Sequence, residues 1–160
     1  MLKIENLTKT YGHKKAVDDL SLHIESGSIY GFIGHNGAGK TTTLKAIVGI
    51  MNFDSGDIYI DGKSIKKDAL ACKKIMAYIP DNPDLYEYLT GIKYLNFICD
   101  VYGVDQEKRT ERIKKYSDMF ELSDSLGESI SAYSHGMKQK LAIIAAVVHE
   151  PKLIIMDEPF

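Results

Sequence analysis

One stretch of nine residues, 34–42, constrains this chain more than any other. It reads Gly-His-Asn-Gly-Ala-Gly-Lys-Thr-Thr and fits the pattern G-x-x-x-x-G-K-[ST]. The short apolar run 29–33 before it is typical of a strand, and residues 43–48 after it suit a helix that ends at Gly49. A strand, a glycine-rich turn and a helix surround one anion with backbone N–H groups, because glycine permits the close approach. The stretch therefore predicts a binding site for a nucleoside triphosphate.

The residue types within this stretch suit individual roles in holding a triphosphate. Lys40 would contact the β- and γ-phosphates, Thr41 would place its hydroxyl on Mg²⁺, and Thr42 would donate to an inner phosphate. The predicted nucleotide-binding residues are Gly34, His35, Asn36, Gly37, Ala38, Gly39, Lys40, Thr41 and Thr42.

A second feature lies near the end of the chain, where the apolar run 153–156 is followed by two acidic residues. A continuous apolar run suits a central parallel strand, and ligands of α/β sheets bind at the carboxyl ends of such strands. Asp157 is therefore a candidate Mg²⁺ ligand, and Glu158 is a candidate for polarising the water that attacks the γ-phosphate. A strand that ends in acids is common, so this pattern is specific only in combination with the phosphate loop.

Length and charge restrict the class of protein further. The chain has 160 residues, enough for one domain with a core, and its 44% hydrophobic and 26% charged residues are typical of a soluble globular protein. The formal net charge of −2 gives no electrostatic case for nucleic-acid binding. The N-terminus lacks the apolar run of a signal peptide, and the longest apolar run, 141–148, is far shorter than the roughly 20 residues that span a bilayer. We expect a cytoplasmic chain that does not cross a membrane by itself.

The hydrophobic periodicity predicts two kinds of structure. The runs 2–7 and 20–24 alternate between apolar and polar residues, and 57–60 and 75–79 are further short strand-like runs. Residues from about 84 to 148 have helical spacing instead. These patterns predict an α/β chain in which antiparallel strands and a strand–loop–helix unit precede a helical stretch.

Three motifs together resemble those of the ATP-binding cassette (ABC) family. Residues 34–42, 133–139 and 153–159 look like its Walker A, signature and Walker B motifs, in that family's order and separation. Tyr11 matches the aromatic residue that stacks on adenine, and Asp81 falls where the family places its Q-loop. The resemblance covers essentially the whole chain and implies an α/β P-loop NTPase (ABC ATPase) core with an antiparallel β part and an inserted α-helical subdomain. The implied boundaries are 1–80 and 151–160 for the core and about 84–148 for the helical subdomain.

The resemblance implies a separate role for each of the matching residues. ATP and Mg²⁺ would be the cofactors, with Mg²⁺ held by Thr41 and Asp157, and Glu158 would act as the catalytic base. Ser134 and Gly136 would bind the γ-phosphate held by a second subunit, because the family closes two nucleotides between head-to-tail domains. A helix start at these two residues would suit that role, since a helix N-terminus favours an anion.

Three positions depart from the common pattern of the family. His135 replaces the usual signature Gly and Met137 its closing Gln, which resembles a branch of the family with many exporters. Asp81 replaces the usual Q-loop Gln. Its shorter, charged side chain is a candidate ligand for Mg²⁺ or a water, but a turn-forming Asp beside two prolines is an equally good interpretation.

The favoured interpretation is the ATP-hydrolysing subunit of an ABC transporter. It would lie on the cytoplasmic face of the membrane, bound to separate transmembrane subunits and to a second nucleotide-binding domain, in a homo- or heterodimer, without nucleic acid. Two alternatives remain, a soluble ABC ATPase of translation or repair and a nucleotide-binding module that does not hydrolyse ATP. A GTPase is disfavoured because the sequence has no Asn-Lys-x-Asp motif.

The position of Glu158 close to the last residue leads to one more expectation. Family members continue after Walker B with a D-loop and a switch histidine, so this chain resembles the first part of a longer nucleotide-binding domain. On its own it is expected to be a poor ATPase, with an apolar sheet face left uncovered.

Overall fold

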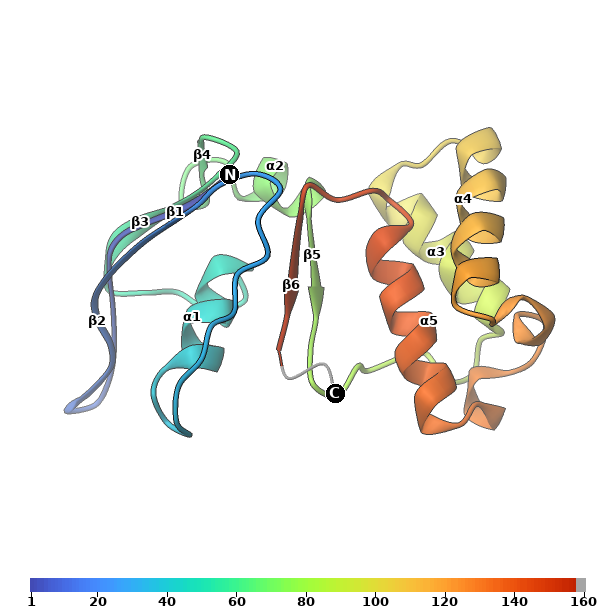
Figure 1. Cartoon of the computed structure of the whole chain (residues 1–160), viewed down its shortest axis with the longest axis horizontal. Helices are drawn as coiled ribbons and strands as arrows, with labels where there is room; N and C mark the ends of the chain where they lie inside the picture. The colour runs from blue at the N-terminus through green and yellow to red at the C-terminus, as the bar shows by residue number, and fades with distance from the viewer. Residues whose placement is uncertain (158–160) are drawn as a thin grey trace. The chain divides into compact units, whose positions relative to one another are not determined.

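The structure is a computed structural model that describes residues 1–157. The chain divides into two compact units, Met1–Met76 and Ala77–Phe160 (Figure 1). Within the described residues, no helix combines the length and the apolar character needed to cross a lipid bilayer.

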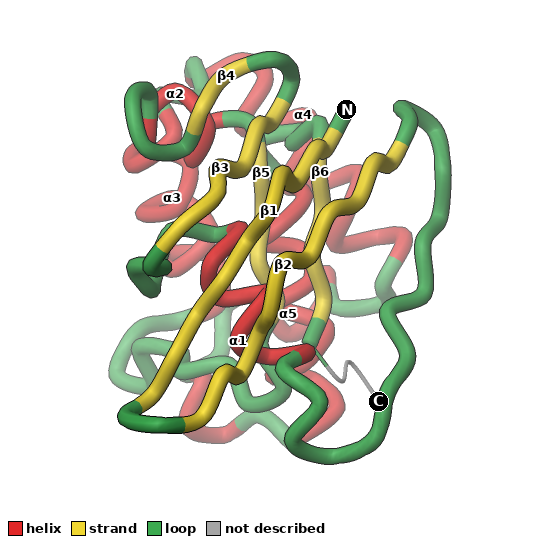
Figure 2. The backbone as a smooth tube through the Cα atoms, turned by 90° about the vertical axis from the view of Figure 1, so that its left-hand side faces the viewer, coloured by secondary structure: helices red, strands yellow, loops and turns green. Residues whose placement is uncertain are grey.

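The first unit is built on an antiparallel sheet (Figure 2). Its strands are β1 (Leu2–Tyr11), β2 (Lys14–Ile24), β3 (Ser55–Ile60) and β4 (Lys63–Ser64), in the order β2-β1-β3-β4. The alternation in 2–7 places apolar side chains of β1 on one buried face, as predicted from the sequence. Strand β2 begins earlier than the predicted run 20–24.

The strand expected at residues 29–33 is not formed, which corrects the sequence prediction. Ile29 is 104% exposed and Ile33 95% exposed, so neither side chain packs on a core. Within residues 1–157, no strand pairs with this segment, and both edges of β1 are already occupied by β2 and β3. An apolar run forms a strand only where a neighbouring strand accepts its backbone hydrogen bonds.

Two helices complete the first unit. Helix α1 (Lys40–Ile47) begins within the glycine-rich stretch, earlier than residues 43–48 suggest, and Gly49 follows its end with φ = 68°. The positive φ is the conformation expected of a glycine that terminates a helix. Helix α2 (Ala69–Lys74) is short and lies beside β4.

The second unit combines a small sheet with helices. Strands β5 (Met76–Ile79) and β6 (Leu153–Met156) form a two-stranded sheet and run in the same direction (Figure 1). The helices are α3 (Gly91–Tyr102), α4 (Gln106–Met119), η1 (Ser123–Ser125), η2 (Ile130–Ala132) and α5 (His135–Val147). These helices lie between Gly91 and Val147, within the range 84–148 whose spacing predicts helices, and the bounds of a helical subdomain stay a prediction.

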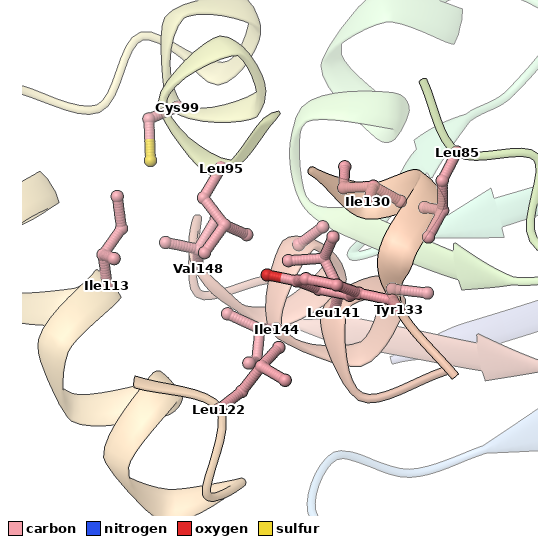
Figure 3. Packing of buried hydrophobic residues seen from close by; sticks show 12 residues of the cluster. Leu85, Leu95, Cys99, Ile113, Leu122, Ile130, Tyr133, Leu141, Ile144 and Val148 are labelled. Atoms are coloured by element: carbon pink, nitrogen blue, oxygen red, sulfur yellow. The ribbon is translucent and has the colours of Figure 1, made fainter. Parts of the chain in front are cut away.

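One hydrophobic core holds these helices together (Figure 3). It gathers Leu95 from α3, Ile113 from α4 and Ile144 from α5, and the first and last of these side chains are completely buried. Each fully buried aliphatic side chain of this size contributes about 1.5–3 kcal/mol to folding. This core positions the N-terminus of α5.

Replacing Gly91 with alanine is expected to destabilise the second unit by about 2 kcal/mol. A Cβ at Gly91 would overlap the hydroxyl of the buried Tyr133, which donates a 2.7 Å hydrogen bond to the Ser125 carbonyl oxygen. The free energy of unfolding in urea, measured for Gly91→Ala, Tyr133→Phe and the double variant, tests this contact. The double variant should lose less than the sum of the single losses, and additive losses would contradict the overlap.

Candidate nucleotide-binding site

The glycine-rich loop before α1 has the backbone shape that its sequence predicts. Gly37 and Gly39 have φ angles of 81° and 86°, in the left-handed region that favours glycine. A Cβ at Gly39 would overlap the carbonyl oxygen of Ala16 in β2 and lie 3.2 Å from its carbonyl carbon. The loop also closes on itself, since the Ala38 N–H donates to the His35 carbonyl oxygen at 3.1 Å. Strand β2 therefore sets how closely the loop and α1 approach the sheet.

The side chain of Lys40 folds back over this loop. Its ammonium donates hydrogen bonds to the carbonyl oxygens of Gly34 at 2.6 Å and His35 at 3.1 Å. An ammonium has three donors and no acceptor, so the two hydrogen bonds to carbonyl oxygens hold its positive charge beside the loop. This arrangement places a cation beside the N-terminus of α1, where the backbone N–H groups already favour an anion.

The three threonines that open α1 have different exposures. Thr41 is exposed and Thr42 half-buried, so both hydroxyls suit contact with a ligand. Thr43 is buried, and its hydroxyl donates to the Gly39 carbonyl oxygen at 2.9 Å, beside the backbone hydrogen bond of 2.8 Å to the same oxygen. Sequence reasoning did not assign a role to Thr43, because an anchoring hydroxyl and a ligand-binding hydroxyl look alike in sequence.

Tyr11 lies at the end of β1 with half of its surface exposed. Its hydroxyl donates to the sulfur of Met51, and the Lys9 ammonium lies 5.3 Å from the ring centre. Tyr11 pairs with Lys14 across the hairpin, and Ala16, two residues further along β2, touches Gly39. The β1–β2 hairpin therefore carries the exposed ring of Tyr11 and also contacts the phosphate loop, at Gly39.

Asp157 follows β6, as the sequence predicts, and is 8% exposed. Its backbone N–H donates to the Ile79 carbonyl oxygen at 2.9 Å, and its carboxylate accepts from the Tyr78 hydroxyl at 3.4 Å. Burial raises the pKa of Tyr78 and the nearby Asp157 carboxylate raises it further, so the phenol stays a neutral donor. Tyr78 was not recognised from the sequence. Glu158, the candidate base, lies outside the described residues.

Ser134 is the N-cap of α5, and its hydroxyl oxygen accepts from the Met137 N–H at 3.2 Å. His135 and Gly136 are exposed in the first turn of that helix. A Cβ at Gly136 would meet nothing within 4 Å, so the surface above this turn is open. An open helix N-terminus with a capping hydroxyl is suited to an anion.

Comparison with known proteins decides the family. The family model described as ABC transporter matches residues 17–160. The chain belongs to the ABC transporter family. This chain is similar to a solved structure entitled "Structure of ATP binding subunit of ABC transporter", with a TM-score of 0.94 and 34% sequence identity. The match covers 100% of this chain and 67% of the chain in that structure. The predicted ABC ATPase fold is thereby confirmed.

Several curated ABC proteins from bacteria align with nearly the whole chain. YhcH of Bacillus subtilis, an uncharacterised ABC transporter ATP-binding protein, is 39% identical over 99% of this chain and 51% of its own length. The linearmycin resistance ATP-binding protein LnrL of Bacillus subtilis is 36% identical over 99% of this chain and 51% of its own length. The bacitracin transport ATP-binding protein BcrA of Bacillus licheniformis is 34% identical, and this match also covers 99% of this chain and 51% of the relative. The chain thus spans about half the length of these relatives.

Asp81, which the sequence resemblance places at the Q-loop, is exposed in a bend after β5. Within residues 1–157, no three His, Cys, Asp or Glu side chains come together in a group that could hold a metal ion. Mg²⁺ in nucleotide sites binds through one or two protein oxygens together with substrate phosphates and waters. The Thr41 hydroxyl and the Asp157 carboxylate are groups of the required kind.

The structure distributes the predicted site residues between the two units. Tyr11 and residues 34–42 belong to the first, whereas Asp81, Ser134 and Asp157 belong to the second.

Proposed function

We propose that this chain binds ATP with Mg²⁺ and hydrolyses it to drive transport through separate transmembrane subunits. The phosphate loop carries the proposal, because two left-handed glycines and the Lys40 ammonium form a site for a polyanion at the start of α1. The family match and the relatives named for linearmycin resistance and bacitracin transport support a role in transport, in the direction of export.

Each residue acts through its own chemistry. The loop N–H groups and Lys40 bind the phosphates, and the exposed ring of Tyr11 stacks on the adenine. The hydroxyl of Thr41 and the carboxylate of Asp157 would hold Mg²⁺, which neutralises phosphate charge when bound. Glu158 takes a proton from the attacking water.

The first turn of α5 would act on the nucleotide of a second subunit. The hydroxyl of Ser134 and the exposed N–H groups around Gly136 would bind a γ-phosphate there, so two nucleotide-binding domains close head to tail. The catalytic core would comprise 1–80 and 151–160, with 84–148 as the helical subdomain. The assembly would lie on the cytoplasmic face of the membrane, bound to its transmembrane subunits.

Replacing Glu158 with glutamine in the complete protein is expected to preserve ATP binding and to slow hydrolysis by roughly 10²-fold, since the amide is not a base. ATP should then hold the two domains together as a dimer. Phosphate release and size-exclusion chromatography with Mg-ATP measure both effects. Glu107→Gln, at an exposed position in α4, is the control. Unchanged hydrolysis in Glu158→Gln would contradict the assignment of the base, and hydrolysis absent from the wild type would favour the non-hydrolysing module.

A further inference from the structure

Positive charge is concentrated in one short segment of the first unit. Residues 63–74 contain five lysines and one aspartate, whereas the whole chain has a net charge of −2. We call the side chains of these lysines the lysine surface. Its members are Lys63, Lys66, Lys67, Lys73 and Lys74, all of which are exposed.

The segment is compact, so the charges lie close together. The N–H groups of Lys67 and Asp68 both donate to the Ser64 carbonyl oxygen, at 3.2 and 2.8 Å, which folds the chain between β4 and α2. The thiol of Cys72 in α2 donates to the Lys63 carbonyl oxygen at 3.4 Å, which ties the helix to the strand. Both views show β4 and α2 side by side (Figures 1 and 2).

Within the part of the chain that the structure describes, these lysines form no ion pair. Lys3, Lys9 and Lys15, in the same unit, each pair with a carboxylate. The nearby Asp57 carboxylate pairs with none of the lysine surface and accepts hydrogen bonds from the Ser64 hydroxyl at 2.8 Å and from the Ile58 N–H at 2.7 Å. Five lysines against one aspartate leave residues 63–74 with a local excess of positive charge.

Exposed apolar side chains accompany the lysines. Leu70, in the middle of α2, is 68% exposed, and Ile50 is 64% exposed. Gly49, the residue before Ile50, lies against the side chain of Lys73, since a Cβ there would be 3.3 Å from the Lys73 Cε. Lysines beside exposed aliphatic residues match a lipid surface, where ammonium groups meet headgroups and apolar side chains enter the acyl boundary.

We propose that the lysine surface, with Leu70 and Ile50, docks this chain on a membrane of anionic lipids. This proposal depends on the proposed function in one respect, which is that the chain lies at a membrane. Nucleic acid fits less well, because the exposed side chains that accompany these lysines, Leu70 and Ile50, are aliphatic and offer no stacking surface for a base. Contact with lipid would hold the first unit at the bilayer independently of any protein partner.

A vesicle-binding experiment tests the proposal. The purified protein is sedimented with vesicles of phosphatidylcholine alone or of phosphatidylcholine mixed with phosphatidylglycerol. Each lysine near an anionic surface strengthens partitioning about fivefold, so Lys67→Glu/Lys74→Glu should bind the anionic vesicles at least about 20-fold more weakly than the wild type. The matched control Lys93→Glu/Lys115→Glu makes the same change in net charge at exposed positions of α3 and α4.

The outcomes separate this proposal from the others. Loss of anionic-vesicle binding in the first variant alone, with raised salt weakening the wild type, supports lipid docking. Equal binding to both kinds of vesicle, or equal binding by the two variants, overturns it. The proposal would also be overturned if the wild type bound duplex DNA as tightly as the anionic vesicles and Lys67→Glu/Lys74→Glu lost that binding. The lysine surface would then be a general surface for polyanions. A Mg-ATP titration of both variants reports on the proposed function separately, because none of these lysines belongs to the phosphate loop.

Discussion

Replacement of Gly39 by alanine is expected to destabilise the first unit by about 3 kcal/mol or more and to abolish measurable ATP binding. The new Cβ would overlap the carbonyl oxygen of Ala16, a backbone atom of β2 that cannot move without disturbing the β1–β2 hairpin. The φ angle of 86° adds strain, since L-residues rarely adopt it. Relief of the overlap would displace the start of α1, and Lys40 with it. Urea unfolding followed by circular dichroism measures the stability.

Gly27→Ala is the matched control for this variant. Gly27 has a similar φ of 79°, but a Cβ there would meet nothing within 4 Å. Its replacement should therefore cost only the backbone strain, about 1–2 kcal/mol, and leave ATP binding intact. Equal losses of stability in the two variants would show that contact with Ala16 does not position the phosphate loop.

The sequence predicts the elements whose patterns are local. Alternation identifies β1, and helical spacing between 84 and 148 identifies the helices of the second unit, because one buried face determines each pattern. The run 29–33 has the composition of a strand and yet forms none in the structure. Strand formation depends on a partner, which no local pattern can reveal.

The candidate site was predictable where residue type determines the chemistry. The glycines, lysine and threonines of residues 34–42 and the acid after β6 were all recognised from their spacing. The contact of Gly39 with Ala16, the anchoring bond of Thr43 and the hydrogen bond from Tyr78 to Asp157 were not. These are tertiary contacts between segments distant in sequence or between atoms that a motif does not distinguish.

Replacement of Lys40 by alanine is expected to weaken Mg-ATP binding by at least about 10²-fold. A charge-assisted hydrogen bond contributes about 1.5–3 kcal/mol, and one lysine that contacts two phosphates loses two such bonds. The fold should survive, because within residues 1–157 the ammonium bonds to carbonyl oxygens of the exposed loop, at Gly34 and His35. Lys45→Ala, an exposed lysine on the same helix, is the control and should bind ATP as the wild type does.

Isothermal titration of Mg-ATP into the wild type, Lys40→Ala and Lys45→Ala tests the central claim, that residues 34–42 hold the phosphates of ATP. The predicted result is saturable binding by the wild type and by Lys45→Ala, with a Kd at least about 10²-fold higher in a folded Lys40→Ala. An unchanged Kd in Lys40→Ala, or the absence of binding by a folded wild type, would contradict the claim.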